Sequence, residues 1–332
     1  MFFKIVAKNN HGNLGSRDMK KIAFIFPGQG SQFVGMGKDL YDNFDEAKKV
    51  FDTANIALGK SITNICFEGP EEDLKQTINT QPAIVTMSIA AMETLKSKLN
   101  ITPNYTAGHS LGEYCAMYAS GVMNLENTFK AIQKRAEVMS EVKGGAMAAV
   151  LNASEEVLRA GLEEGSKVGY VDVANYNSPA QVVITGDENA VEKAGEYYLA
   201  NGVRRFVPLP VSGAFHSKYM EKAGHNFETF VADLELNDAT IPVITNVDAN
   251  ETTLSDEFRA KMPRQIYSSV HWTQTIQKMV ENGVDTFIEI GPGKVLAGLN
   301  KKIAPEATVY NIFDKESLES TINSLRENLV EI

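Results

Sequence analysis

Short apolar runs alternate with longer amphipathic stretches along most of the chain. Residues 22–26 (IAFIF) are wholly apolar and end at Pro27-Gly28, which predicts a buried strand of the kind found in parallel sheets. Residues 125–142 repeat apolar side chains with a helical period and end at Gly144-Gly145, which predicts a helix with one face in the core. Strands and helices that alternate in this way indicate an α/β fold with a mostly parallel sheet.

The same signals predict most of the other elements outside the middle of the chain. A helix is expected to begin at Gln81-Pro82, because proline is well tolerated in the first turn of a helix. The turn at 291–293 leads into a last core helix. The remaining predicted elements are strands at 105–109, 242–246 and 286–290, and helices at 38–58, 217–233 and 255–267.

The middle of the chain has a different rhythm, with predicted elements in the order βαββαβ. This order is that of a ferredoxin-like unit. We therefore expect a small subdomain, residues 145–210, inserted into a large α/β subdomain made of residues 19–144 and 211–332. The predicted strands are 146–151, 171–175, 181–185 and 204–207, and the predicted helices are 154–164 and 188–201.

Residues 1–18 differ from the sequence that follows them. They lack the apolar stretch and the small-residue cleavage site of a signal peptide. Met19 precedes Lys20-Lys21 and the first predicted strand, so we take Met19 as the natural start. We expect residues 1–18 to be an extension outside the fold.

Composition narrows the class of protein. The 332 residues, of which 43% are hydrophobic and 22% charged, fit a globular protein of roughly two domains. No apolar run approaches the ~20 residues of a membrane span, and a net charge of -10 argues against a general nucleic-acid binder. The two cysteines, Cys66 and Cys115, belong to no CxxC pair or Cys/His cluster, so neither a disulfide scaffold nor a structural metal site is expected. A reducing, cytoplasmic location fits this cysteine usage.

The clearest chemical signal is a Gly-x-Ser-x-Gly motif at residues 108–112. It follows a predicted strand and precedes a helical stretch, which is the setting of a nucleophile elbow. Two glycines allow a turn tight enough to expose Ser110 above the sheet, and the free N–H groups at the start of the helix face any negative charge that develops there. We therefore predict that Ser110 is a nucleophile. The alternative is a tight turn without a catalytic role.

A serine nucleophile needs a base, and the chain has five histidines. His216 ends a strand-like run just before a predicted helix, which is where open α/β sheets place functional groups. Elimination favours His216 over the others. These are His11 in the extension, His109 beside Ser110 with its side chain expected to point away, His225 in a polar helix and His271 at a helix start.

No acidic residue stands out as the third member of a triad. The chain order of the hydrolases would place this acid between residues 110 and 216, where Asp172 and Asp187 are available. Both fall in the predicted small subdomain. The simpler hypothesis is a Ser–His dyad in which a backbone carbonyl orients His216.

Arg135 is informative because of its position on the predicted helix 125–142. It lies on the inward side of that helix, three residues after Ile132 and four before Met139. A guanidinium that faces inward needs a partner. The partner could be structural, such as a buried glutamate, or it could be a substrate carboxylate that the guanidinium binds with two hydrogen bonds.

The loop at 27–32 (PGQGSQ) follows the first predicted strand. A dinucleotide-binding loop would need a third glycine where Phe33 stands, so we do not expect a Rossmann site. The alternative use of the loop is to offer the backbone N–H of Gln29 to an oxyanion hole, opposite that of Leu111.

Taken together, these motifs resemble the malonyl-CoA:acyl carrier protein transacylases and the acyltransferase domains of polyketide and fatty acid synthases. The resemblance runs from about residue 21 to residue 313, and the order and spacing of its motifs are highly specific. The motifs are FPGQGSQ (26–32), TQPAI (80–84), GHSLGEY (108–114), the helix with Arg135, NYNSPAQVVITG (175–186), PVSGAFHS (210–217), RQIY (264–267) and IGPGKVLAGL (290–299).

The resemblance implies a fold, a mechanism and a set of roles. The fold would be an α/β-hydrolase-like large subdomain with an inserted ferredoxin-like one. Ser110 would form a malonyl ester, which is then passed to the phosphopantetheine thiol of acyl carrier protein, and no cofactor beyond the CoA thioester substrate is implied. The other implied roles are His216 as base, Gln29 and Leu111 in the oxyanion hole, Arg135 on the malonyl carboxylate, and Gln265 near the active site in support of His216.

Substrate and pathway follow from the same resemblance. In related acyltransferase domains, a bulky Phe directly before the base tends to accompany malonyl substrates, and Phe215 precedes His216 here. We expect a malonyl transferase of fatty acid synthesis that acts as a separate, monomeric protein, with a polyketide pathway left open. The competing hypotheses are a thioesterase or esterase on the same elbow and a non-catalytic, partner-binding member of a synthase assembly.

Overall fold

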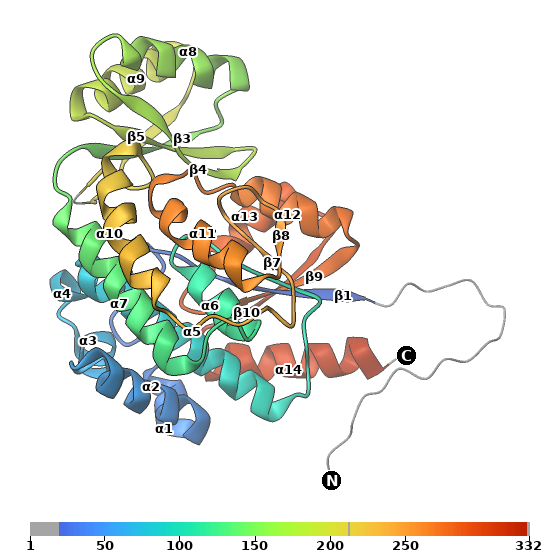
Figure 1. Cartoon of the computed structure of the whole chain (residues 1–332). Helices are drawn as coiled ribbons and strands as arrows, with labels where there is room; N and C mark the ends of the chain where they lie inside the picture. Colours follow the sequence, from blue (N-terminus) through green and yellow to red (C-terminus); the bar gives the residue numbers. More distant parts are fainter. Residues whose placement is uncertain (1–19, 212, 331–332) are drawn as a thin grey trace.

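Two β-sheets of different construction organise the chain (Figure 1). The computed structural model describes residues 20–211 and 213–330, so the predicted extension 1–18 lies outside the described residues. One sheet has six strands and is mostly parallel, and the other has four antiparallel strands. The predicted α/β fold class, with a parallel sheet and a smaller ferredoxin-like one, is confirmed.

The large sheet has the strand order β10-β9-β1-β2-β7-β8, and every pair in it is parallel except β7 with β8. Successive side chains of a strand point to opposite faces. Accordingly, Phe24 and Phe26 pack into one core cluster, and Ala23 and Ile25 pack into the other. The strands are β1 (Lys21–Phe26), β2 (Tyr105–Gly108), β7 (Val243–Ile244), β8 (Glu251–Thr252), β9 (Val284–Ile290) and β10 (Thr308–Ile312).

Helices cover both faces of the large sheet (Figure 1). The face with Phe24 carries the larger core, to which α2, α5, α7, α10 and α14 contribute, and the opposite face packs against α12 and α13. No helix among the described residues is long and apolar enough to cross a membrane. The helices are α1 (Lys38–Asn43), α2 (Asp45–Leu58), α3 (Ile62–Glu68), α4 (Glu71–Lys75), α5 (Thr77–Lys98), α6 (Gly112–Ala119), α7 (Leu125–Glu141), α10 (Glu221–Ala232), α11 (Ser255–Tyr267), α12 (Trp272–Glu281), α13 (Val295–Ile303) and α14 (Lys315–Val330).

The small sheet has the order β4-β5-β3-β6 and carries two helices on one face. Along β3, Ala148 and Val150 pack under these helices, whereas Met147 and Ala149 join the core of the large sheet. The division into 145–210 and the rest stays a prediction. The elements are β3 (Ala146–Leu151), α8 (Glu155–Ser166), β4 (Val171–Ser178), β5 (Gln181–Gly186), α9 (Glu188–Ala200) and β6 (Arg205–Pro208).

The predicted helix over 38–58 is wrong, because the chain forms two helices there. Phe44 adopts an extended conformation between α1 and α2. The buried residues Leu40 and Ala47 are seven positions apart, a spacing that fits one continuous helix as well as two. Periodicity therefore could not reveal the break.

The predicted helix start at Gln81-Pro82 is also wrong. Helix α5 begins at Thr77, and Pro82 lies inside it. Proline has no N–H, so the carbonyl of Ile78 loses its partner within the helix. The Lys60 ammonium replaces that partner, with Nζ donating to the Ile78 oxygen at 3.0 Å.

Two further boundaries differ from the prediction. The stretch predicted as a helix at 217–233 starts with a 3-10 turn, η1 (Lys218–Met220), and only then becomes α10. The strand predicted at 242–246 shrinks to the two residues of β7. Its last predicted position, Asn246, has a different use, described below.

Candidate active site

Ser110 stands on a sharp turn between β2 and α6. Its φ angle is 52°, in the left-handed region that costs energy for a residue other than glycine. A Cβ on Gly108 would lie 1.9 Å from the carbonyl carbon of Gly112, and one on Gly112 would lie 2.3 Å from the Phe26 carbonyl oxygen. Both glycines of the motif are therefore required by close backbone contacts, as the tight turn predicted.

The hydroxyl of Ser110 lies 2.8 Å from Nε2 of His216. The Nδ1–H of His216 donates to the carbonyl oxygens of Gln265 and Ser268, both at 3.0 Å. Since a carbonyl only accepts, these bonds place the proton on Nδ1 and leave the lone pair of Nε2 facing Ser110. Burial, with a smaller contribution from Arg135, lowers the pKa of His216 to about 3, so the ring is neutral at pH 7 and can accept a proton.

Neither carboxylate weighed as a third triad member bonds to His216. Asp187 accepts from the Tyr219 hydroxyl at 2.6 Å, and Asp172 accepts from the N–H of Val173 at 2.7 Å. Backbone carbonyls orient the imidazole instead, which is the arrangement of the predicted dyad.

Arg135 reaches the same point from α7 and is 1% exposed. Its Nη2 donates to the Ser110 hydroxyl at 3.0 Å and to Oε1 of Gln265 at 3.0 Å. Its Nη1 donates to Oε1 of Gln81 at 2.7 Å. Every hydrogen-bond partner of the guanidinium among the described residues is therefore uncharged.

A buried glutamate does lie near Arg135, but it is bonded elsewhere. Glu113 interacts with the guanidinium electrostatically, while its Oε2 accepts from the N–H of Asn246 at 2.6 Å. The ring of Tyr114 lies 5.7 Å from the guanidinium carbon and helps to stabilise the buried cation. No ion pair to Arg135 is formed within the described residues, so no carboxylate is bonded to the guanidinium, and an anion could replace one of its uncharged partners.

The two residues expected to supply the N–H groups of an oxyanion hole both lie at the site. Gln29 and Leu111 line one cavity with Ser110. Among the residues that the structure describes, neither N–H donates to a protein acceptor. The N–H of Ser110 itself is occupied, since it donates to Oδ1 of Asn246 at 2.8 Å.

Gln265 connects the parts of the site, and Phe215 lines it. Nε2 of Gln265 donates to the Ser110 carbonyl at 2.8 Å, its Oε1 accepts from Arg135, and its backbone oxygen accepts from His216. Phe215 is buried and lines the cavity directly before His216. The structure thus brings every predicted site residue to one place.

His109 departs from the expectation that its side chain points away from the nucleophile. It lines the same cavity as Ser110, and its Nε2 lies 2.7 Å from Oδ1 of Asn177 on β4. Its ring also lies 5.7 Å from that of Trp272, centroid to centroid. Both neighbours of Ser110, His109 and Leu111, therefore line the cavity, and Leu111 also belongs to the larger core.

Three residues of the network were not singled out from the sequence. Gln81 and Glu113 lie within the TQPAI and GHSLGEY motifs, but no role was assigned to them. Asn246 ends the predicted strand 242–246, and the carboxyl end of a parallel strand is a place where functional groups gather. That rule could have identified Asn246.

The cavity at Ser110 has a volume of about 100 Å³. The small sheet contributes Met147 on β3 and Asn175 on β4 to its lining. No cluster of three or more His, Cys, Asp or Glu side chains in the described part of the chain could hold a metal ion. The lining residues are Gln29, Gln81, His109, Ser110, Leu111, Arg135, Met139, Met147, Asn175, Leu209, Val211, Phe215 and His216.

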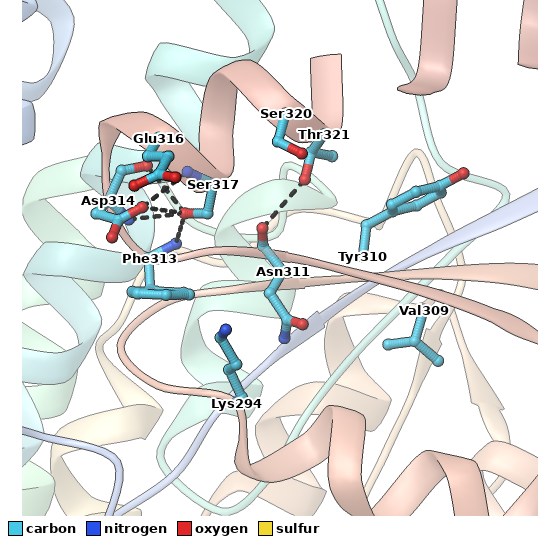
Figure 2. A pocket seen from close by; sticks show the side chains of 10 residues that line it. All are labelled: Lys294, Val309, Tyr310, Asn311, Phe313, Asp314, Glu316, Ser317, Ser320 and Thr321. Carbon is cyan, nitrogen blue, oxygen red and sulfur yellow. Dashed lines mark hydrogen bonds between the residues drawn. The ribbon is translucent and has the colours of Figure 1, made fainter. Parts of the chain in front are cut away.

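A larger pocket of about 380 Å³ lies between β10 and the start of α14 (Figure 2). The Ser317 hydroxyl accepts from the N–H groups of Phe313 and Asp314, and Asp314 in turn accepts from the N–H of Ser317. The Thr321 hydroxyl donates to the Asn311 carbonyl at 3.1 Å. These polar groups cap the helix and tie it to β10, so we assign the chemistry to the cavity at Ser110.

Comparison with known proteins agrees with this geometry. The family model described as "Acyl transferase domain" matches residues 23–316. A malonyl CoA-acyl carrier protein transacylase of Bacillus subtilis is 43% identical over 313 residues, which cover 93% of this chain and 98% of that protein. The transacylase of Escherichia coli (strain K12) is 36% identical over 307 residues, covering 92% and 99%.

Solved structures of similar proteins superpose closely on this chain. A malonyl CoA-acyl carrier protein transacylase from Clostridium perfringens has a TM-score of 0.89 at 42% identity, and the match covers 93% of this chain and 98% of that one. A complex of a type II PKS acyl-carrier protein with its malonyl-transacylase gives a TM-score of 0.89 at 35% identity, covering 92% and 100%. Fold, motifs and similarity over nearly the whole length agree, and the chain belongs to the acyl transferase domain family.

Proposed function

We propose that the protein transfers the malonyl group of malonyl-CoA to the phosphopantetheine thiol of acyl carrier protein through a malonyl ester of Ser110. One observation carries the proposal. The buried guanidinium of Arg135 lies 3.0 Å from the Ser110 hydroxyl and bonds only uncharged groups among the described residues. A nucleophile with a cation beside it suits an acyl group that ends in a carboxylate.

In the first half-reaction, Ser110 Oγ attacks the thioester carbonyl carbon and its proton passes to Nε2 of His216. The negative charge on the thioester oxygen is stabilised by the N–H groups of Gln29 and Leu111. When the carbon–sulfur bond breaks, the CoA thiolate takes the proton from His216 and leaves. The malonyl group remains as an ester on Ser110.

In the second half-reaction, the thiol of the carrier protein's phosphopantetheine attacks the ester carbonyl. His216 takes the thiol proton and returns it to Oγ as the carbon–oxygen bond of the ester breaks. Gln265 holds the imidazole through its backbone oxygen and the guanidinium through its side chain. The site regenerates itself without a cofactor, since the CoA thioester is a substrate.

Arg135 also gives a reason for substrate selection. An acyl group without a carboxylate would leave the buried guanidinium without an anionic partner, which costs binding free energy. Phe215, buried beside the base, limits the room for a branch on the acyl group. We infer that malonyl is preferred over acetyl, through Arg135, and over methylmalonyl, through Phe215.

The comparisons support the choice of donor and acceptor. The relatives in Bacillus subtilis and Escherichia coli are named for malonyl CoA and acyl carrier protein, and one structural neighbour is itself a complex with an acyl-carrier protein. We propose fatty acid synthesis as the pathway and the cytoplasm as the location, where free thiols such as Cys66 and Cys115 persist. The type II PKS neighbour keeps a polyketide role as the second candidate.

The test is the intact mass of the protein after mixing with malonyl-CoA alone. We expect a stable gain of one malonyl group, absent in Ser110→Ala and discharged when a phosphopantetheinylated carrier protein is added. Steady release of CoA without an adduct would instead indicate a hydrolase. If no adduct forms and no CoA is released, the result contradicts the proposed substrate. Acetyl-CoA and methylmalonyl-CoA would then serve as comparison donors.

A further inference from the structure

Asn246 follows the short strand β7 and lies beside the nucleophile turn. The strand pairs with β2 only at Val243 and Thr106, two residues before β2 ends at Gly108. Beyond that point the sheet ladder stops, although the turn at Ser110 still has backbone groups to satisfy. Asn246 is 0% exposed and fills this position with its side chain.

The side-chain amide of Asn246 binds both sides of the turn. Its Nδ2 donates to the Gly108 carbonyl at 2.7 Å, and its Oδ1 accepts from the Ser110 N–H at 2.8 Å. An amide with this pattern replaces the donor and acceptor that a neighbouring strand would supply. The same Oδ1 also accepts from Nε2 of Gln265 at 3.3 Å.

The backbone of Asn246 is fixed as firmly as its side chain. Its N–H donates to Oε2 of Glu113 at 2.6 Å, and its carbonyl accepts from the N–H of His271 at 3.1 Å. Glu113 lies in the first turn of α6, three residues after the nucleophile. The carboxylate therefore ties the end of β7 to the helix that begins at the active site.

This arrangement bears on catalysis through the conformation of Ser110. The left-handed φ of 52° is costly and persists only where surrounding contacts enforce it. The same bond to Oδ1 withdraws the Ser110 N–H from the oxyanion, which leaves that task to Leu111 and Gln29. Asn246 thus contacts the backbone at two points just before the Cα of the residue that carries the reacting oxygen, and it does not line the cavity at Ser110.

We propose that Asn246, held in place by Glu113, is a positioning residue that keeps the Ser110 turn in its reactive conformation. The inference rests on the proposed role of Ser110 as nucleophile. It predicts a loss of reaction rate at saturating substrate, with substrate affinity nearly unchanged. A structural role alone would lower stability and leave the rate per folded molecule unchanged.

The experiment uses two probes of the full-length chain. A fluorophosphonate reports on Ser110 alone: Oγ bonds to phosphorus, His216 takes the proton and fluoride leaves. Malonyl-CoA in rapid-quench mass measurements gives the acylation rate at saturation and the half-saturating concentration. The matched control is Asn300→Ala, which removes another fully buried asparagine. Asn300 lies in α13, and its Oδ1 accepts from Nε1 of Trp272 in α12.

We expect Asn246→Ala to slow both reactions by about 10- to 100-fold, because a small misplacement of the nucleophile has effects of this size. The half-saturating concentration should stay within about threefold of the wild-type value. Asn246→Asp tests the same contact at nearly constant volume. It replaces the Nδ2 donor with an oxygen, which cannot donate to the Gly108 carbonyl. Glu113→Gln keeps an acceptor for the Asn246 N–H and should retain most of the rate, whereas Glu113→Ala should lose about tenfold.

Several results would overturn the proposal. Wild-type rates in Asn246→Ala and Asn246→Asp would do so, as would equal slowing in Asn300→Ala. A raised half-saturating concentration at an unchanged rate would assign Asn246 to substrate binding instead. If the fluorophosphonate labels the wild type but malonyl-CoA does not, the proposed substrate fails while the positioning role is still decided by labelling. Labelling by neither would remove both proposals.

Discussion

The edge of the large sheet buries charged side chains, and the facing side of the small sheet does not. At the large sheet, Arg135, Gln265 and Asn246 are buried and bonded to one another and to Ser110. On the small sheet, Met147 and Ala149 join the larger core, and the polar side chains buried nearby, Asn175 and Asn177, are uncharged. Among the described residues from 145 to 210, no carboxylate is buried.

The difference indicates that the large sheet holds the reacting groups and that the small sheet covers them. Charged and strained groups are held where two parallel strands end side by side and loops meet, as expected for an open α/β sheet. The small sheet shields the reacting groups from water, which strengthens electrostatic contacts within the cavity. Changes at the large sheet should therefore alter rate and selectivity, and changes at the small sheet should alter them little.

The largest expected effect is at His216. Replacing it in His216→Ala removes the only base that bonds to Ser110 in the described structure, so acylation by malonyl-CoA should slow by about 10²- to 10⁴-fold. Rapid-quench mass measurements of the malonyl adduct give this rate. His225→Ala, on the exposed side of α10, is the control and should keep the wild-type rate. A loss below tenfold in His216→Ala would place the base elsewhere.

The next effect concerns selectivity at Arg135. Arg135→Ala removes the cation proposed to bind the substrate carboxylate, so malonyl transfer should fall about 30- to 1000-fold, or roughly 2–4 kcal/mol. Transfer from acetyl-CoA should fall far less, because acetyl makes no such bond. Competition between the two donors, followed by mass, measures the ratio directly.

Two other variants sharpen the test of Arg135. Arg135→Lys keeps the charge but not the planar fork and should lie between the wild type and Arg135→Ala. Lys134→Ala removes a neighbouring, partly exposed cation of α7 and should leave the ratio unchanged. Equal losses for malonyl and acetyl in Arg135→Ala would mean that Arg135 supports the site without selecting the substrate.

A carboxyl group buried beside the large sheet should also make the free energy of unfolding depend on pH. Burial raises the pKa of Glu289 from 4.5 to about 7, although the N–H groups of Leu296 and Ala297 lower it. Between these pH values the folded chain keeps a proton that the unfolded chain has released, so the stabilisation is present below pH 4.5 and is lost as the pH rises to 7. At about 1.4 kcal/mol per pKa unit, the loss in unfolding free energy is roughly 3 kcal/mol.

Urea unfolding at pH 5, 6 and 7 measures this slope. Burial also raises the pKa of Glu113 to about 7 and lowers that of His216 to about 3, and these two groups contribute slopes of opposite sign that remain in Glu289→Gln. The contribution of Glu289 is therefore the difference between the slopes of the wild type and of Glu289→Gln. Glu188→Gln, an exposed site at the start of α9 in the small region, should keep the full slope. An unchanged slope in Glu289→Gln would show that this carboxyl group does not titrate between pH 5 and 7.

Much of this comparison could be predicted from local patterns. The glycines of the 108–112 motif and the inward position of Arg135 follow from turn geometry and helical period, and both are features of a single element. The order βαββαβ is likewise predicted from consecutive segments of the sequence. Such signals depend on residues close together in the sequence, so these predictions require no knowledge of tertiary contacts.

The parts that could not be predicted depend on contacts between distant segments. The start of α5 escaped prediction because the Lys60 ammonium, 18 residues away from Ile78, satisfies the carbonyl that Pro82 leaves free. Asn246 bonds to Ser110, 136 residues earlier in the sequence, and no periodic signal marks that meeting. The role of a buried polar side chain of this kind becomes evident only when the fold shows which distant residues it contacts.

The smallest expected effect concerns Asn177, the polar contact that the small sheet makes with the nucleophile turn. Its Oδ1 lies 2.7 Å from Nε2 of His109, next to Ser110. Asn177→Ala removes one hydrogen bond, worth about 0.5–1.5 kcal/mol, so acylation should slow by about two- to tenfold. Asn201→Ala, at the exposed end of α9, is the control and should behave as the wild type. A loss as large as that of Arg135→Ala would mean that the small sheet takes part in the reaction, and that it does more than cover the groups held by the large sheet.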